Sequence, residues 1–274
     1  MPNKQEDQFF TVGDATYRYR IEGTGDMLVL LHGFTGTMHT WDLLTETLRD
    51  QFTVLRIDLP GHGKTNCPTG RTMEQFSNDL HALLEELNVH RCILLGYSLG
   101  GRTALSFAQF FPEKVRALLL ESASPGLATE AERTARVERD EVLAKKIETN
   151  GVEAFVDAWE NIPLFATQKA LPEAVRATIR AERLSQSKAG LAMSLRTMGT
   201  GVQEPWWDML EAMAMPVTLI VGAQDEKFVH INEKMKRSLS CGELFVVAQA
   251  GHCVHVEQVE KFAKIVWKQL TKIE

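Results

Sequence analysis

Three residues of the 274-residue chain have the types and the chain order of a nucleophile, an acid and a histidine: Ser98, Asp225 and His252. In such a triad the histidine accepts the serine proton, while the carboxylate holds the histidine tautomer and stabilises the imidazolium. A serine hydroxyl is a poor base or nucleophile unless it is activated in this way. The sequence therefore predicts a serine-based active site that attacks a carbonyl or removes a proton.

Ser98 lies inside a G-x-S-x-G sequence, Gly96-Tyr97-Ser98-Leu99-Gly100. An apolar run at 93–95 precedes this sequence, and helical sequence from about 102 to 111 follows it. The arrangement is typical of a nucleophile elbow, a tight strand-to-helix turn that exposes the serine hydroxyl. The strained turn requires very small side chains two positions away from the serine, which the flanking glycines provide. A glycine-rich turn with an incidental serine is the alternative interpretation.

The loop after the apolar run 27–31 could supply a second part of the site. It reads His32-Gly33-Phe34-Thr35-Gly36, and enzymes with a nucleophile elbow place a backbone oxyanion donor in such a loop. The expected donors are the N–H of Phe34 and the N–H of Leu99, the residue after the serine. Such donors must be fixed in place before negative charge develops. A plain strand-to-helix turn is the alternative interpretation of this loop.

Other histidines and the cysteines are weaker candidates for chemistry. His62 lies in the turn Asp58-Leu-Pro-Gly-His-Gly63 and is expected to be structural. His255 is the rival of His252, but no glycine turn precedes it. The four cysteines lack the spacing of a metal site and the density of a disulfide framework, so we expect free thiols and no metal. They are Cys67, Cys92, Cys241 and Cys253.

Apolar runs and amphipathic segments alternate along the chain. The segment 9–21 suits an antiparallel hairpin, and later strands are expected at 27–31, 53–57, 93–95, 115–120, 217–221 and 244–247. Helices are expected at 41–48, 73–87, 102–111 and 256–270. Continuous apolar strands separated by helices are typical of a parallel sheet covered on both faces. We therefore predict an α/β fold with a mostly parallel central sheet flanked by helices.

The alternation stops at about residue 127 and resumes after residue 204. Between these points no convincing strand is visible, and helical patterns occupy 129–149, 151–159, 172–184 and 190–198. We therefore expect a core made of residues 1–126 and 205–274, and a helical cap made of residues 127–204. Binding sites of open α/β sheets lie at the carboxyl edge of the sheet, so a cap at that edge would shape the substrate pocket.

Composition narrows the class of protein. Hydrophobic residues make up 44% of the chain and charged residues 24%, as in ordinary globular proteins. The net charge of −6 argues against a nucleic-acid partner. No apolar run approaches membrane-spanning length and no basic, apolar leader is visible, so we expect a cytoplasmic protein without membrane insertion. We also expect a monomer or a weak homo-oligomer.

Five motifs together resemble those of the α/β-hydrolase superfamily over nearly the whole chain. They are His32-Gly-Phe-Thr-Gly36, Asp58-Leu-Pro-Gly-His-Gly63, Gly96-Tyr-Ser-Leu-Gly-Gly-Arg102, Gly222-Ala-Gln-Asp225 and Ala250-Gly-His252. The resemblance implies an α/β-hydrolase fold with the chain order nucleophile, acid, histidine. This superfold hosts many reactions, so the motifs indicate the fold more strongly than the reaction.

A narrower resemblance comes from the elbow and the helical insertion. The elbow is similar to that of the menaquinone-pathway synthases that make 2-succinyl-6-hydroxy-2,4-cyclohexadiene-1-carboxylate. The insertion resembles the same family in Pro125-Gly-Leu127, in a helix with Arg133, Arg136 and Arg139, in Trp159 before Pro163-Leu-Phe-Ala166, and in Glu182-Arg-Leu-Ser-Gln186. The resemblance implies elimination of pyruvate from 2-succinyl-5-enolpyruvyl-6-hydroxy-3-cyclohexene-1-carboxylate, without a metal or cofactor.

The same resemblance assigns roles to further residues. It implies that three arginines hold substrate carboxylates and that two aromatic residues line the pocket: Arg102, Arg136 and Arg183, and Tyr97 and Trp159. A substrate with three carboxylates needs fixed cations, and the planar fork of arginine pairs with a carboxylate bidentately. Seven arginines but only four lysines fall between residues 131 and 196. For most of these arginines, a solvated face paired with nearby glutamates is the alternative interpretation.

In the implied mechanism, Ser98 is activated by His252 and removes a ring proton as a base, after which pyruvate leaves. An esterase or a carbon–carbon bond hydrolase acting on an anionic substrate would use the same triad through nucleophilic attack. A ligand-binding receptor on a hydrolase fold, with a slow or vestigial triad, is the alternative from another class.

Overall fold

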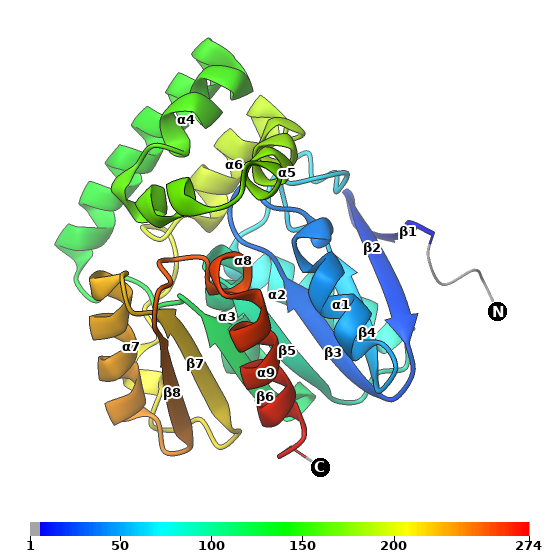
Figure 1. The fold of residues 1–274 in the computed structure, drawn as a ribbon. Helices are drawn as coiled ribbons and strands as arrows, with labels where there is room; N and C mark the ends of the chain where they lie inside the picture. The colour runs from blue at the N-terminus through cyan, green and yellow to red at the C-terminus, as the bar shows by residue number, and fades with distance from the viewer. Residues whose placement is uncertain (1–5, 274) are drawn as a thin grey trace.

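The computed structural model describes residues 6–273, which fold around an eight-stranded sheet (Figure 1). The strand order is β1-β2-β4-β3-β5-β6-β7-β8. The strands span Gln8–Val12 (β1), Ala15–Gly23 (β2), Asp26–Leu31 (β3), Phe52–Ile57 (β4), Cys92–Tyr97 (β5), Val115–Glu121 (β6), Val217–Gly222 (β7) and Gly242–Val247 (β8). β1 and β2 form an antiparallel hairpin, β2 is antiparallel to β4, and each pair from β4 to β8 is parallel. The predicted hairpin and the predicted, mostly parallel sheet are confirmed.

Helices cover both faces of the sheet and extend beyond one end of it (Figure 1). They span Asp42–Leu48 (α1), Met73–Glu86 (α2), Leu99–Phe110 (α3), Glu130–Trp159 (α4), Glu173–Leu184 (α5), Lys188–Met198 (α6), Glu226–Ser238 (α7), Val254–Glu257 (α8) and Val259–Leu270 (α9). Short 3-10 helices span Met38–Trp41 (η1), Pro112–Lys114 (η2), Pro163–Ala170 (η3) and Trp207–Met209 (η4).

Alternate residues of the central strands are buried against different helices. In β3, Leu28 and Leu30 belong to the core cluster under α1 and α9, whereas Val29 and Leu31 belong to the cluster under α2 and α3. Successive side chains of a strand point to opposite faces, so both faces of this sheet are buried. For this reason the strands consist of continuous apolar runs and not of alternating apolar and polar residues.

The prediction of one final helix over 256–270 is wrong at its start. α8 and α9 are separated at Gln258, whose φ of −139° and ψ of 57° lie outside the helical range. The Gln258 side chain donates to the Gln249 carbonyl at 3.0 Å, across the loop that carries His252. By contrast, the break predicted between 129–149 and 151–159 is present inside α4, because Gly151 has φ 85° and ψ 172°.

The segment from 127 to 204 forms a helical layer of α4, η3, α5 and α6, and it contains no strand. α4 packs against α5 and α6, and the layer lies beyond one end of the sheet (Figure 1). Phe34, which follows β3, packs its ring edge-to-face against Phe155 and Trp159 of α4. The layer therefore covers the edge of the sheet at which the parallel strands end.

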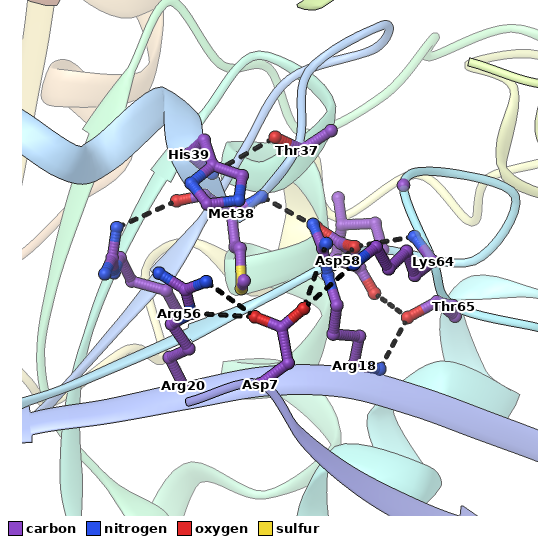
Figure 2. A network of polar contacts seen from close by, with 12 residues as sticks. Asp7, Arg18, Arg20, Thr37, Met38, His39, Arg56, Asp58, Lys64 and Thr65 are labelled. Atoms are coloured by element: carbon purple, nitrogen blue, oxygen red, sulfur yellow. Dashed lines mark hydrogen bonds and ion pairs between the residues drawn. The ribbon is translucent and has the colours of Figure 1, made fainter. Parts of the chain in front are cut away.

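A network of ion pairs and hydrogen bonds around Asp58 holds the segment between β3 and α1 against the sheet (Figure 2). The Asp58 carboxylate, fully buried after β4, pairs with Arg18 Nε of β2 at 2.7 Å. The same carboxylate accepts hydrogen bonds from the Met38 N–H and the Lys64 N–H, each at 2.8 Å. A buried charge is costly unless it is paired and hydrogen-bonded. Asp58 therefore determines where Met38 lies, and with it the end of the loop after β3.

Candidate active site

Ser98 occupies a strained turn between β5 and α3. Its backbone has φ 51° and ψ −107°, a region that non-glycine residues populate sparsely. A Cβ atom at Gly96 would lie 2.2 Å from the Gly100 carbonyl oxygen, and a Cβ atom at Gly100 would lie 2.1 Å from the Leu31 carbonyl oxygen. Side chains at these positions would collide with backbone, so the two glycines are required by the turn itself.

The structure brings Ser98, His252 and Asp225 together in one hydrogen-bonded row. His252 Nε2 lies 3.1 Å from Ser98 Oγ, and His252 Nδ1 lies 2.7 Å from Asp225 Oδ2. The carboxylate accepts the Nδ1 proton, which leaves Nε2 free to accept the serine proton. Both His252 and Asp225 are buried, so little water competes for their hydrogen bond.

The two other histidines considered from the sequence lie in different networks. His255 Nδ1 lies 2.9 Å from Glu121 Oε2, and the His255 N–H donates to Glu121 Oε1 at 3.0 Å. His62 is bonded through Nδ1 to the Pro60 carbonyl at 3.1 Å. Neither residue takes part in the hydrogen-bonded row that contains Ser98.

The backbone groups predicted as oxyanion donors are free to bind a ligand. Within the part of the chain that the structure describes, neither the Phe34 N–H nor the Leu99 N–H donates to a protein acceptor. The loop is fixed by His32, whose Nδ1–H donates to the Gly33 carbonyl at 2.8 Å and whose Nε2 accepts from the Leu59 N–H at 2.9 Å. Burial lowers the pKa of His32, which keeps the ring in the neutral form that these two bonds require.

Arg102 lies on α3, one turn after Ser98, and its guanidinium is bonded to neutral acceptors. It donates to the Met198 carbonyl at 3.0 Å and to Gln203 Oε1 at 2.7 Å. Among the described residues, no carboxylate forms an ion pair with it. Burial, and secondly the nearby charge of Arg136, lower the pKa of Arg102. An arriving anion would therefore be a favourable partner for this cation.

Arg183, on α5, is a second cation that no carboxylate of the described chain neutralises. Its side chain is almost completely buried, with 6% of the residue exposed. The guanidinium donates to Gln168 Oε1 at 3.0 Å and lies 4.8 Å from the centre of the Phe165 ring. A buried charge is costly when it is not paired, and an amide oxygen and a π-face compensate only part of that cost. Arg183 is therefore also suited to bind an anion.

Arg136 differs from these two arginines because it already has an anionic partner. Its Nε lies 2.8 Å from Asp140 Oδ1, and 37% of its side chain is exposed. Other arginines of the helical layer form surface ion pairs, as the alternative interpretation proposed: Arg180 with Asp157 and Glu160, and Arg196 with Glu141 and Glu148. Such pairs leave no net positive charge for a ligand.

Tyr97 and Trp159, the expected pocket residues, contribute a hydroxyl group and an indole. The Tyr97 hydroxyl lies 2.7 Å from Cys253 Sγ, and its ring centre lies 5.4 Å from that of His252. Burial raises the pKa of Tyr97 well above its usual value, so the hydroxyl stays neutral. Trp159 lies 5.6 Å from Phe34 between ring centres, and its buried Nε1 has no hydrogen-bond partner among the described residues.

Comparison with known proteins identifies the family. Residues 26–259 match the family defined by the alpha/beta hydrolase fold. The chain belongs to the α/β-hydrolase family. A protein of Bacillus subtilis (strain 168), provisionally named a 2-succinyl-6-hydroxy-2,4-cyclohexadiene-1-carboxylate synthase, is 46% identical over 96% of this chain and 98% of its own length. The synthase of the same name from Enterobacter sp. (strain 638) is 32% identical, over 84% of this chain and 86% of its own length.

Solved structures of other α/β hydrolases agree with this assignment. MenH from S. aureus superposes with a TM-score of 0.90 at 33% identity, covering 94% of this chain and 98% of that chain. A thermophilic esterase from Thermogutta terrifontis superposes with a TM-score of 0.85 at 26% identity, covering 98% of this chain and 99% of that chain. The predicted α/β-hydrolase fold is confirmed.

A cavity of about 370 Å³ opens beside the triad of this α/β hydrolase. It lies between α1, α5 and the α8–α9 segment, and its wall includes Phe34, Tyr97 and Arg183. Ser98 and His252 are not part of the wall. The cavity therefore reaches the neighbours of the triad, and Arg183 can be approached from it.

No sequence pattern marks the residues that hold the two arginines without a carboxylate partner in residues 6–273. Gln203 accepts from Arg102 across 101 residues of chain, and Gln168 accepts from Arg183 across 15 residues. Glutamine has many structural uses, so no local spacing marks these two. Cys253, which the sequence indicates only as a free thiol, is the hydrogen-bond partner of the Tyr97 hydroxyl.

Within the described residues of this α/β hydrolase, no three His, Cys, Asp or Glu side chains gather in a way that could hold a metal ion. The cysteines Cys67, Cys92, Cys241 and Cys253 are free thiols. Residues 6–273 also include no helix with the length and apolar character needed to span a membrane.

Proposed function

We propose that this protein eliminates pyruvate from 2-succinyl-5-enolpyruvyl-6-hydroxy-3-cyclohexene-1-carboxylate, giving 2-succinyl-6-hydroxy-2,4-cyclohexadiene-1-carboxylate in menaquinone biosynthesis. Relatives named for this product match most of the chain. The observation that carries the proposal is a pair of arginines near the triad, Arg102 and Arg183, without a carboxylate partner in the described chain. A substrate with three carboxylates supplies anions for both cations, whereas a neutral ester does not.

Ser98 acts as a base in the proposed mechanism. His252 accepts the Ser98 proton, and the serine oxygen removes the ring proton alpha to the succinyl carbonyl. The electron pair of the broken C–H bond forms an enolate, whose oxygen is stabilised by the N–H groups of Phe34 and Leu99. Collapse of the enolate shifts the ring double bond, forms a second one and breaks the C–O bond to the enolpyruvyl group. The released enolpyruvate takes up one proton and becomes pyruvate.

In the same proposal, residues 127–204 act as a cap over a core of residues 1–126 and 205–274. Arg136 shares a substrate carboxylate with Arg102, which its exposure and its electrostatic effect on Arg102 support. Tyr97 and Trp159 line the pocket. The unpaired Nε1 of Trp159 supports that role, because a buried donor gains from a ligand acceptor.

An esterase acting on an anionic substrate is the second candidate function. The likeness to the Thermogutta terrifontis esterase favours it, because the same triad can attack a carbonyl carbon. That reaction forms an acyl-enzyme in which the acyl group is bound to Ser98. Mass spectrometry detects this acyl-enzyme after the protein is mixed with an anionic aryl ester. An acyl-enzyme without pyruvate release would favour the esterase, and tight binding without turnover of any substrate would favour a receptor.

The decisive experiment measures pyruvate release by the wild type, Ser98→Ala and Arg102→Ala. We expect Ser98→Ala to lower kcat roughly a thousandfold or more. Arg102→Ala should cost about 2–3 kcal/mol of transition-state stabilisation, the scale of a charge-assisted hydrogen bond that is left unmade. Arg139→Ala is the matched control, because Arg139 is exposed on the same helical layer. Normal turnover in both test variants would contradict the proposal.

A further inference from the structure

The C-terminal turn of α5 holds the chain just after the Phe34 N–H. Glu182 Oε1 accepts hydrogen bonds from the Thr37 N–H at 2.9 Å, from the Thr37 hydroxyl at 2.7 Å and from the Thr40 hydroxyl at 3.1 Å. A glutamate near the C-terminal end of its own helix is placed unfavourably in the helix dipole. The three bonds to another segment offset that cost, which indicates that Glu182 acts between the helical layer and the loop.

Gln186 holds the strained part of the same loop. Its Nε2 donates to the Thr35 carbonyl at 3.2 Å and to the Gly36 carbonyl at 3.0 Å, and its Oε1 accepts from the Gly63 N–H at 3.0 Å. Thr35 has a φ of 70°, and a non-glycine residue keeps such a conformation only when its surroundings impose it. The buried Gln186 amide supplies part of that restraint.

Arg183 lies between these two residues in the chain, in the last turn of α5. Its guanidinium is buried against Phe165 and Gln168, and it lines the cavity together with Phe34. A shift of the end of α5 therefore moves the cation and the restraints of the loop at the same time.

The core of the protein holds the loop from the opposite side. The Met38 N–H is bonded to the buried Asp58 carboxylate at 2.8 Å (Figure 2), whereas the neighbouring Thr37 is bonded to Glu182. The position of the Phe34 N–H thus depends on His32 and Asp58 on the side of the core. On the side of the helical layer, it depends on Glu182 and Gln186.

We propose that Glu182 and Gln186 are positioning residues. They hold the Phe34 N–H where it can bind an oxyanion formed beside Ser98, and they couple its position to that of Arg183. The proposal rests on the proposed function only for the roles of Arg183 and Phe34. A carboxylate bound by Arg183 keeps the end of α5 on the loop, so binding of that part of the substrate also completes the oxyanion site. A substrate without that carboxylate loses both effects.

The test uses a small fluorophosphonate, so it needs no natural substrate. Ser98 Oγ attacks phosphorus, fluoride leaves and the serine proton passes to His252, so the labelling rate reports the triad and the oxyanion donors. We expect Glu182→Ala and Gln186→Ala to slow labelling roughly 10- to 100-fold. Glu182→Gln keeps an acceptor oxygen and should stay within roughly threefold of the wild type. The control is Glu138→Ala, an exposed glutamate of α4 that should label at the wild-type rate.

The amount of label bound at completion counts the folded active sites, so each rate is expressed per site. A merely structural role of Glu182 or Gln186 would lower this amount or the melting temperature, but not the rate per site. Wild-type rates per site in both alanine variants, or an equal loss in Glu138→Ala, would overturn the positioning role. Slowed labelling in the two variants, with no pyruvate release by the wild type, would support that role and contradict the proposed lyase function.

Discussion

At the scale of single residues, two glutamines orient the arginines that we propose to bind the substrate. Arg102 and Arg183 each donate to a glutamine amide oxygen, which orients a guanidinium without neutralising it. Arg196, by contrast, is neutralised by Glu141 and Glu148 on the surface. The positive charge of the first two arginines therefore remains available, which supports the proposed anionic substrate over a neutral one.

Replacing Arg183 by glutamine should raise the KM for the proposed substrate about tenfold or more, since a charge-assisted hydrogen bond is worth about 1.5–3 kcal/mol. Arg183→Lys should recover only part of the loss, because an ammonium lacks the planar fork that binds a carboxylate bidentately. Steady-state pyruvate release measures both effects, with the exposed Arg176→Gln on the same helix as control. An unchanged kcat/KM in Arg183→Gln would remove Arg183 from the site.

The triad could be predicted from the sequence because its chemistry admits few residue types and the fold places them at strand ends. Ser98 is marked by its glycines, and His252 by the turn before it. The difference between Arg136 and Arg183 could not be predicted. Both are arginines on amphipathic helices, and only the folded chain shows that Asp140 neutralises one of them while the other is buried against neutral groups.

At the scale of elements, the apolar runs located the strands well, but the helix ends depend on contacts between distant segments. α3 begins at Leu99, earlier than the predicted start near 102. Glycine is a poor helix former, so Gly100 and Gly101 conceal this start in the sequence. A Cβ atom at Gly101 would lie 2.6 Å from Ala123 Cβ, so the glycine allows the helix to pack closely on the sheet.

The break between α8 and α9 has a similar origin. The apolar pattern of the last helix continues through Gln258, so periodicity alone predicts one helix. In the folded chain, His255 is anchored to the buried Glu121 by its ring and its backbone N–H, which fixes α8 beside β6. The chain then changes direction before α9 covers the sheet, and the sequence shows no breaker at that point.

Gly100→Ala should abolish activity and destabilise the fold by about 3 kcal/mol or more, because its Cβ atom would meet the Leu31 carbonyl at 2.1 Å, where only backbone could move. Gly151→Ala is the control. Gly151 has a positive φ, of 85°, but a Cβ atom there would meet nothing within 4 Å. Strain at this φ and ψ should cost about 1–3 kcal/mol, with no loss of activity per folded protein. Urea denaturation gives the folded fraction of each variant, and wild-type pyruvate release per folded protein in Gly100→Ala would contradict the steric role of the elbow glycine.

At the scale of the whole molecule, the fold disfavours protonation of two buried histidines next to the active site. His62 and His32 are almost completely buried, with ring centres 5.2 Å apart. Burial, together with the neighbouring His32, lowers the pKa of His62 to about 3, and burial lowers the pKa of His32. An unfolded histidine titrates near 6.5, so below that pH the unfolded chain binds more protons than the folded one. Folding is then opposed increasingly as the pH falls.

The free energy of unfolding should therefore decrease from about pH 6.5 downward, by up to about 1.4 kcal/mol per pH unit for each such histidine. The contribution of His62 should stop changing once the pH has fallen through its folded-state pKa of about 3. Urea denaturation between pH 7.5 and about pH 4.5 measures the slope. His62→Asn should flatten it whatever its effect on stability at neutral pH, because the variant removes one site of proton uptake. His230→Asn, at an exposed position of α7, should leave the slope unchanged. A wild-type slope in His62→Asn would mean that other groups cause the loss of stability in acid.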